Sequence, residues 1–396
     1  MGSGINNWQA PGQGGVGPLE LEFISASDPT RSSKLVTFTS YQFKRSLLSP
    51  ASPFRFTAPG VSVDVRLSIR SGDTVQLFAY DGNGTRYPIA LGIVDETETH
   101  ISDTVDYTIS GRDILGQLVD NASVDANNNL IYFEQASIKT ICGSIVANTR
   151  VPKGFTFNQV PNGNFLFTSN SGETKMTALQ RMLDFANLLV WSSPDGQMIV
   201  GKPNFAQQAS GILLLSSSSP ANNNLVEASV RRNVNQAIRV CITQLQDLQS
   251  ANPSAFPAIS ILNNDDDVSV LRPRLVGRSV YESFDYGNGT DSINQINQVG
   301  NQSANYNDIG RSYSRRKIAM ENIKVLDVEA IAKDHINSFG GIYNIDQMYA
   351  TVIDDEEISQ PLYVYECSYE MTENTGCLTR LKLCKENTIV DGARAV

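Results

Sequence analysis

Long apolar runs are missing from this sequence of 396 residues, and stretches such as Ile212 to Leu215 have only the length of a strand. A membrane-spanning helix needs about 20 consecutive apolar residues, so we expect no membrane insertion. The first residues, Met1 to Gly4, lack the charged and apolar regions of a secretory signal. Asn6 occupies the position where a myristoylation site needs Ser or Thr. These absences predict synthesis in the cytoplasm.

Cysteine is scarce and scattered, with five residues at Cys142, Cys241, Cys367, Cys377 and Cys384. No two of them have the short spacing of a zinc ribbon. An odd number without a regular framework is typical of reduced, mostly buried thiols. We therefore expect neither a disulfide framework nor a structural metal.

Positive charge is also in short supply, because 31 Lys and Arg residues face 41 Asp and Glu residues, for a net charge of −10. A chain this acidic repels phosphates, which argues against specific binding of nucleic acid. The hydrophobic fraction of 41% is large enough to build folded cores. The length predicts two to four domains.

Residue sets that carry catalysis are absent as well. The sequence has two histidines, His100 and His335, which we interpret as solvated or hydrogen-bonded side chains. It has no Ser/His/Asp set, phosphate loop or His-Glu-x-x-His motif. The remaining acidic candidates are Asp265-Asp266-Asp267, Asp354-Asp355-Glu356-Glu357, Glu366, Glu370 and Glu373. The two runs lack the spacing of a calcium loop, and strand context argues against a glycosidase pair. We predict no catalytic, cofactor-binding or metal-binding residue, and no enzyme.

What the sequence does contain is strand pattern. Alternating or β-branched stretches predict strands at 19–23, at Val61, Val63 and Val65, and at 74–80, 87–94, 105–109, 188–191, 197–200, 348–353, 362–369 and 377–384. Asp81 to Gly84 is typical of a hairpin turn, and 226–243 predicts two further strands. Residues 250–310 are rich in Asn, Asp, Gly and Ser, which indicates long loops around short strands.

Helical spacing occurs in three places. Ser137 is an expected N-cap for a helix to Val146, and apolar residues from Met176 to Ala186 predict a second helix. Val328, Ile331, Ala332 and His335 predict a third, from Asp327 to Phe339, ended by Gly340-Gly341.

The tripeptide Gly111-Arg112-Asp113 lies where a strand ending at Ile109 meets an apolar helical pattern. We expect Gly111 to allow a turn that a Cβ atom would strain. Asp113 is expected to cap the helix, and Arg112 to pair with a nearby carboxylate.

Two stretches resemble each other, 74–113 and 349–387. Each has a strand, an acidic turn, a strand led by proline (Pro88 or Pro361), a polar loop and a final alternating strand. They are either copies of one small barrel or sandwich or a chance similarity between two ordinary β-meanders.

Several segments together resemble the baseplate hub proteins of contractile-tail phages of the Mu and T4 kind, which are related to the hub part of type VI secretion spike proteins. The resemblance is carried by 72–75, 93–95, Ser110 to Ser123, the segment from Gly172 through the helix to Leu189, 195–198 and 376–383. The segments are scattered over most of the chain, and their order is more specific than any one of them. The resemblance implies a homotrimer in which each subunit gives two similar small barrels to a ring of six.

We therefore predict a mainly β fold with some α (α+β), built of two similar small β-barrel tube-type domains plus an intervening α+β domain. The predicted division is an N-terminal arm and first strands at 1–50, the first tube-type domain at 51–120 with part of the arm, the α+β domain at 121–205 with the possible addition of the 250–312 loops, the second tube-type domain at 206–249 and 313–390, and a tail at 391–396.

The predicted function is that of a structural hub in a contractile tail baseplate, located in the virion. Expected partners are two further copies, the tail tube protein, the central spike protein and other baseplate proteins, while DNA only passes through. The channel wall is expected to be acidic or neutral, although the acidity could equally serve to keep the free protein soluble. The alternatives are a carbohydrate-binding or adhesive β-protein of the virion surface, which needs exposed aromatics such as Trp8 or Trp191, and a wall hydrolase fused to a hub.

Overall fold

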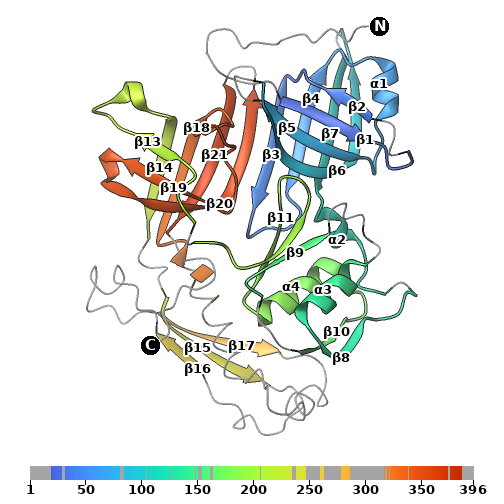
Figure 1. Ribbon diagram of the computed structural model, residues 1–396, viewed down its shortest axis with the longest axis vertical. Coiled ribbons are helices and arrows are strands. Elements are labelled where there is room, and N and C mark those ends of the chain that lie inside the picture. The colour runs from blue at the N-terminus through green and yellow to red at the C-terminus, as the bar shows by residue number, and fades with distance from the viewer. Residues whose placement is uncertain are drawn as a thin grey trace.

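One large sheet organises the computed structural model (Figure 1). The structure describes residues 19–28, 32–80, 84–103, 105–125, 127–147, 149, 154–160, 164–205, 207–233, 238–246, 259–262, 278–285, 316, 319–320, 322–337, 339–372 and 375–385. The sheet has 13 strands, and its main path runs β14-β18-β21-β20-β3-β4-β7-β6-β5-β1-β2. Off this path, β19 pairs with β20, and β13 pairs with β19. The mainly β fold class is confirmed. Among the described residues this path is open, and no pairing closes either part into a barrel.

We call the N-terminal part of this sheet the first half. Its strands are β1 (Leu19–Ile24), β2 (Ser32–Leu35), β3 (Ser40–Ser46), β4 (Pro53–Pro59), β5 (Thr74–Tyr80), β6 (Arg86–Ile101) and β7 (Val105–Asp113). The predicted strands at 19–23, 74–80, 87–94 and 105–109 are confirmed, although β6 and β7 are longer than expected. The predicted turn at 81–84 falls mostly outside the described residues.

The C-terminal part is the second half. It contains β13 (Ile212–Leu215), β14 (Leu225–Arg232), β18 (Leu326–Lys333), β19 (Gln347–Ile353), β20 (Ile358–Thr372) and β21 (Gly376–Cys384). Two short 3-10 turns, η1 (Pro220–Asn222) and η4 (Asp354–Glu356), connect strands here. The three predicted C-terminal strands are confirmed.

The two similar sequence stretches form equivalent meanders. In the first half, β6 pairs antiparallel with β5 and β7; in the second, β20 pairs antiparallel with β19 and β21. Each long central strand has a β-bulge, between Val94 and Glu96 in β6 and between Val364 and Glu366 in β20. A bulge bends a strand and increases its twist. The shared position of the bulge makes the two meanders structural copies of each other.

A smaller α+β unit lies beside the first half (Figure 1). It contains α2 (Gly116–Asp120), β8 (Tyr132–Ala136), α3 (Ile138–Val146), β9 (Phe155–Asn158), β10 (Phe165–Thr168), α4 (Lys175–Phe185), β11 (Leu189–Ser192) and β12 (Met198–Gly201). Ser137 caps α3 as predicted, by accepting a hydrogen bond from the Thr140 N–H, and Thr174 caps α4. This unit has its own hydrophobic core, distinct from the core shared by the two halves.

A separate three-stranded sheet has β15 (Ile238–Gln246) between β16 (Ile259–Leu262) and β17 (Arg278–Asp285). The two strands predicted within 226–243 are confirmed, but β15 joins this sheet and not β14. No helix in the described ranges is long and apolar enough to cross a membrane.

Two sequence-based assignments were wrong. The strand expected at Val61, Val63 and Val65 is the helix α1 (Val63–Ser68), because Ser62 accepts a hydrogen bond from the Val65 N–H as its N-cap. The helix expected from Asp327 to Phe339 begins as the strand β18, which is paired on both sides by β14 and β21. Val328, Ala330 and Ala332 also fit a period of two, and the neighbouring strands decide between the two periods.

Candidate structural site at the seam between the sheet halves

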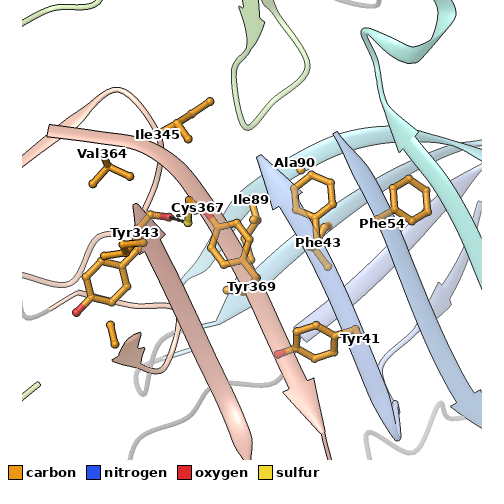
Figure 2. Packing of buried hydrophobic residues seen from close by; sticks show 14 of the residues in the cluster. Tyr41, Phe43, Phe54, Ile89, Ala90, Tyr343, Ile345, Val364, Cys367 and Tyr369 are labelled. Carbon is orange, nitrogen blue, oxygen red and sulfur yellow. Dashed lines mark hydrogen bonds between the residues drawn. The ribbon is translucent and has the colours of Figure 1, made fainter. Parts of the chain in front are cut away.

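The two halves become one sheet where β3 pairs with β20, a contact that we call the seam. Tyr41 to Ser46 of β3 lie antiparallel to Glu366 to Met371 of β20. On one face of the seam the side chains are apolar, and Figure 2 shows Tyr41, Phe43 and Tyr369 close together there. The rings of Phe43 and Tyr369 stack at 6.2 Å between centroids. The seam is therefore part of the core and not a surface contact between two finished domains.

A buried arginine holds three parts of the molecule together at the seam. Arg45 is only 1% exposed. Its guanidinium donates hydrogen bonds to the carbonyl of Ile89 in β6, to the side-chain oxygen of Asn344 before β19, and to the carbonyl of Ser192 in β11. These acceptors come from the first half, the second half and the α+β unit. A buried charge is costly unless it is hydrogen-bonded, so Arg45 fixes the three parts in one arrangement.

Asp113 lies buried in the same region. Its carboxylate accepts hydrogen bonds from the Ser192 hydroxyl and from the Leu115 N–H, both at 3.1 Å. Burial raises the pKa of Asp113 to about 6, although the nearby Arg45 charge opposes the increase. The predicted N-cap role was wrong, because β7 extends to Asp113 and α2 begins at Gly116 without a side-chain cap. Asp113 instead joins β7 to β11.

The predicted partner of Arg112 exists, and there are two. The Arg112 guanidinium pairs with Asp95 at 2.7 Å and with Asp120 at 2.5 Å. Gly111 is needed for a different reason from the one expected. It lies within β7, where an added Cβ would lie 2.0 Å from the carbonyl oxygen of Ile93 and 2.5 Å from the ring of Phe54. Close packing, and not a turn, excludes a side chain there.

A second set of buried polar side chains, linked by hydrogen bonds, crosses the seam. The Tyr41 hydroxyl lies 2.6 Å from Nε2 of His335, and Nδ1 of His335 lies 2.8 Å from the Thr379 hydroxyl. Thr379 donates in turn to the carbonyl of Asp334, so Nδ1 carries the proton and Nε2 accepts from Tyr41. Burial lowers the pKa of His335 to about 3. His335 is thus a neutral, hydrogen-bonded side chain, whereas His100 is exposed on β6.

The opposite face of the seam is polar and its charges are paired. Lys44 and Lys382 each contact Glu366 at 2.9 Å. Arg380 contacts Glu329 at 2.6 Å and Glu370 at 3.5 Å. Glu366 and Glu370, two of the carboxylates considered for catalysis, are therefore partners of basic side chains on this sheet face.

The other candidates do not assemble into a site. Asp354 to Glu357 form an exposed turn in which Glu356 pairs with Arg232. Trp191 is 2% exposed and belongs to the shared core. Cys142, Cys367, Cys377 and Cys384 are in no disulfide, and within the described ranges no cluster of His, Cys, Asp and Glu could hold a metal ion. Trp8, Asp265 to Asp267 and Glu373 lie outside the described residues, as does the side chain of Cys241.

Sequence reasoning missed Arg45, although a signal was present. Every second residue of a strand points to the same side, so Tyr41, Phe43 and Arg45 share one face of β3. The alternation therefore places Arg45 on the apolar face, where an arginine must find buried acceptors.

Solved structures share this fold. A tail protein from Neisseria meningitidis MC58 matches with a TM-score of 0.71 and 13% identity, covering 95% of this chain and 99% of that one. The 43 kDa tail protein of prophage MuSo2 from Shewanella oneidensis matches with a TM-score of 0.69 and 14% identity, covering 94% and 99%. The chain has the fold of phage tail proteins.

An E. coli component of the type VI secretion system shares the phage tail fold less closely, with a TM-score of 0.50 and 7% identity over 91% of this chain and 77% of that one. It is described as similar in structure to the T4 tail proteins gp27 and gp5. No family model matches the sequence, and no curated protein does. The predicted resemblance to phage tail and type VI spike proteins is confirmed at the level of fold.

Proposed function

We propose that this chain is the structural hub of a contractile phage tail baseplate, acting in the virion. Three copies form a ring that joins a six-fold tail tube to a three-fold central spike and lines the channel through which DNA passes. Its partners are the other two copies, the tube protein, the spike protein and neighbouring baseplate proteins. In this proposal each sheet half corresponds to one tube-type domain, and the α+β unit is the domain between them.

The internal repeat carries the proposal. One chain contains two copies of the same bulged meander, joined side by side through the seam. Three such chains would present six equivalent halves while keeping three-fold symmetry. A protein between a six-fold tube and a three-fold spike needs this combination, and the buried Arg45 contacts keep the two halves in a fixed relation.

The polar face of the seam supports the role as a channel wall. Its basic side chains Lys44, Lys382 and Arg380 all pair with carboxylates of the same sheet. Phosphates bind a surface mainly by replacing counterions at unpaired Lys and Arg. A wall whose cations are already paired would let DNA pass without holding it.

The rival functions gain no support from the described residues. A sugar-binding surface needs an exposed aromatic platform, and Trp191 is buried. A hydrolase needs a concave site with groups of shifted pKa, whereas His335 and Asp113, two groups whose pKa values are shifted, are enclosed in the core. The absence of catalytic and metal-binding residues stays a prediction.

The mass of the purified protein, alone and with its spike partner, tests the proposal, together with cryo-electron microscopy of the assembled tail. We expect a trimer whose ring shows six similar lobes. A protein that is monomeric in solution and also in the particle would overturn the proposal. A strongly basic lumen would overturn the part that concerns DNA passage.

A further inference from the structure

Two strand edges of the large sheet are open in the described part of the chain. Beyond its bulge, β6 pairs only with β7, so the edge of Glu96 to Ile101 that faces away from β7 has no partner strand among the described residues. β14 pairs only with β18 there. Ile101 is 71% exposed and Val226 on β14 is 53% exposed. Open edges with exposed apolar side chains favour pairing with another strand.

The internal repeat shows how these two edges are related. In the first half, cross-strand partners lead from Glu96 to Ser110, from Ser110 to Arg55, and from Arg55 to Gln42 of β3. Each step is a direct antiparallel pair. This path starts just after the bulge of β6 and ends on β3.

The second half repeats the path step by step. Partners lead from Glu366, just after the bulge of β20, to Lys382, then to Glu329, and then to Ser229 of β14. Therefore β14 is the copy of β3, and Ser229 holds the position of Gln42. Two residues further along each strand, Arg231 holds the position of Lys44.

At the seam, β3 fills the outer edge of β20 from Glu366 to Met371. The copy of that edge is Glu96 to Ile101 of β6, which is open. The copy of β3 is β14, whose outer edge is also open. Figure 1 shows β14 and β6 on opposite flanks of the sheet, so they do not meet within one chain. The chain thus makes this strand contact once, between β3 and β20 at the seam. The equivalent contact, between β14 and β6, is not made within one chain.

We propose that β14 of one copy pairs antiparallel with Glu96 to Ile101 of β6 in the next copy, so that the sheet continues from subunit to subunit around the ring. This inference rests on the proposed function and specifies the contact that holds the trimer. The contact is head-to-tail, since two different edges meet, and such contacts produce closed rings when the rotation closes.

The seam also fixes the register of the contact between copies. Gln42 lies opposite Glu370, so Ser229 lies opposite His100 of the next copy. Lys44 lies opposite Ser368, so Arg231 lies opposite Glu98.

The charges of the two edges agree with this register. Lys44 forms its ion pair with Glu366 at 2.9 Å. The equivalent pair between copies is Arg231 with Glu96, which are again opposite in sign. Glu98, directly across from Arg231, adds a second negative charge. Both ends of the contact are exposed in the single chain, so the ion pair is available for a neighbouring subunit.

A crosslinking experiment on the full chain tests the register. His100→Cys combined with Ser229→Cys should give covalent dimers and trimers with a short thiol-reactive crosslinker. Thr99→Cys combined with Ser229→Cys is the matched control, because adjacent residues of a strand point to opposite faces. Gln42→Cys with Glu370→Cys is the positive control, which should crosslink within one chain. The unsubstituted protein gives the background of its native thiols.

A charge exchange tests the ion pair. Arg231→Glu should weaken the trimer by about tenfold or more, because it places like charges together in the contact. Adding Glu96→Arg should restore most of the loss. Arg55→Glu makes the same change of charge on an exposed residue in the middle of the sheet, and it should leave the trimer intact. Oligomer mass against concentration is the measurement.

The outcomes separate the two proposals. A trimer in which the 100/229 pair fails to crosslink, or crosslinks no better than the 99/229 pair, overturns the strand contact and leaves the hub proposal standing. A trimer weakened equally by Arg231→Glu and Arg55→Glu does the same. A protein that stays monomeric at every concentration and in the particle overturns both.

Discussion

The two halves of the large sheet contain the same bulged strand in different surroundings. In β20 the residues after the bulge lie between β3 and β21, and Cys367 and Tyr369 are 0% exposed. The equivalent residues of β6, Thr97 and Thr99, have a strand on one side only and are partly or fully exposed. Apolar side chains occur where both edges are covered, and threonines occur where one edge is open. The difference shows that neighbours, and not the meander itself, determine which face and edge are buried.

The same contrast applies to two equivalent arginines, and it gives the largest expected effect. Arg45 is buried with three acceptors, whereas its copy Arg232 is exposed and pairs with Glu356. Arg45→Met should cost about 3 kcal/mol or more, because buried carbonyl oxygens lose charged donors. Arg232→Met is the control for the separate chain, in which its ion pair is exposed, and it is expected to cost at most about 1 kcal/mol. Denaturant unfolding of both variants measures this, and equal losses would contradict the junction role of Arg45.

The two halves also fill the space around the Phe54 position with side chains of different sizes. In the first half, Phe54 lies against Gly92 and Gly111, whereas the copies of these residues are Val328, Leu362 and Leu383. Gly111→Ala should cost about 2–3 kcal/mol through overpacking. Phe54→Leu in the same chain should not rescue it, because the nearest contact is the carbonyl oxygen of Ile93. Thermal melts test this, and a full rescue would show that the ring alone excludes a side chain.

In acid, the second half should be the weaker one. His335 has a pKa of about 3 in the folded protein, below its ordinary value of 6.5, because burial disfavours the charged ring. The unfolded chain therefore binds a proton first as pH falls below about 6.5, and stability decreases by up to about 1.4 kcal/mol per pH unit. His335→Gln should remove this part of the acid dependence. Melts between pH 7 and pH 4 are the measurement, and parallel curves for both proteins would contradict it.

Asp113, which joins the first half to the α+β unit, should show the opposite sign. Its folded pKa of about 6 lies above the ordinary value of 3.8 for an aspartate. Its contribution is therefore fully present below about pH 4 and is lost as pH rises through 6. Because Asn does not titrate here, the stability of Asp113→Asn relative to the unsubstituted protein should increase as pH rises from 4 to 7. A constant difference would mean that Asp113 is ionised throughout.

The smallest expected effect concerns the thiols. Cys367, Cys377 and Cys384 lie in the second half, and the first half has no cysteine. Burial raises the pKa of Cys367 to about 12, so its thiol is neutral and unreactive. We expect all five cysteines to be reduced and a reductant to leave the melting temperature unchanged. Intact mass after alkylation of the unfolded chain checks this, and a native disulfide would refute it.

Local pattern was sufficient for most of the strands and for two helices. Thr74 to Tyr80 is rich in β-branched and aromatic residues, and its buried and half-buried side chains alternate, so packing against one face is sufficient to make it a strand. Ser137 and the apolar spacing after it specify α3 because capping and amphipathicity involve only residues within a few positions. The repeat was visible for the same reason, although Pro88 and Pro361 were matched wrongly. Pro88 lies six residues before the bulge residue Val94, and Pro361 only three before Val364.

Tertiary structure decided those features for which the local sequence pattern allowed more than one outcome. Val328, Ile331 and Ala332 fit one face of a helix, while Val328, Ala330 and Ala332 fit one face of a strand, and pairing with β14 and β21 selected the strand. The sequence placed Arg45 on an inner face, but only the meeting of three parts of the chain supplied its acceptors. Those acceptors lie 44, 147 and 299 residues away. Hydrogen bonds between such distant residues depend on the order of the strands in the sheet. That order follows from burying all of the strands together, and no single strand determines it.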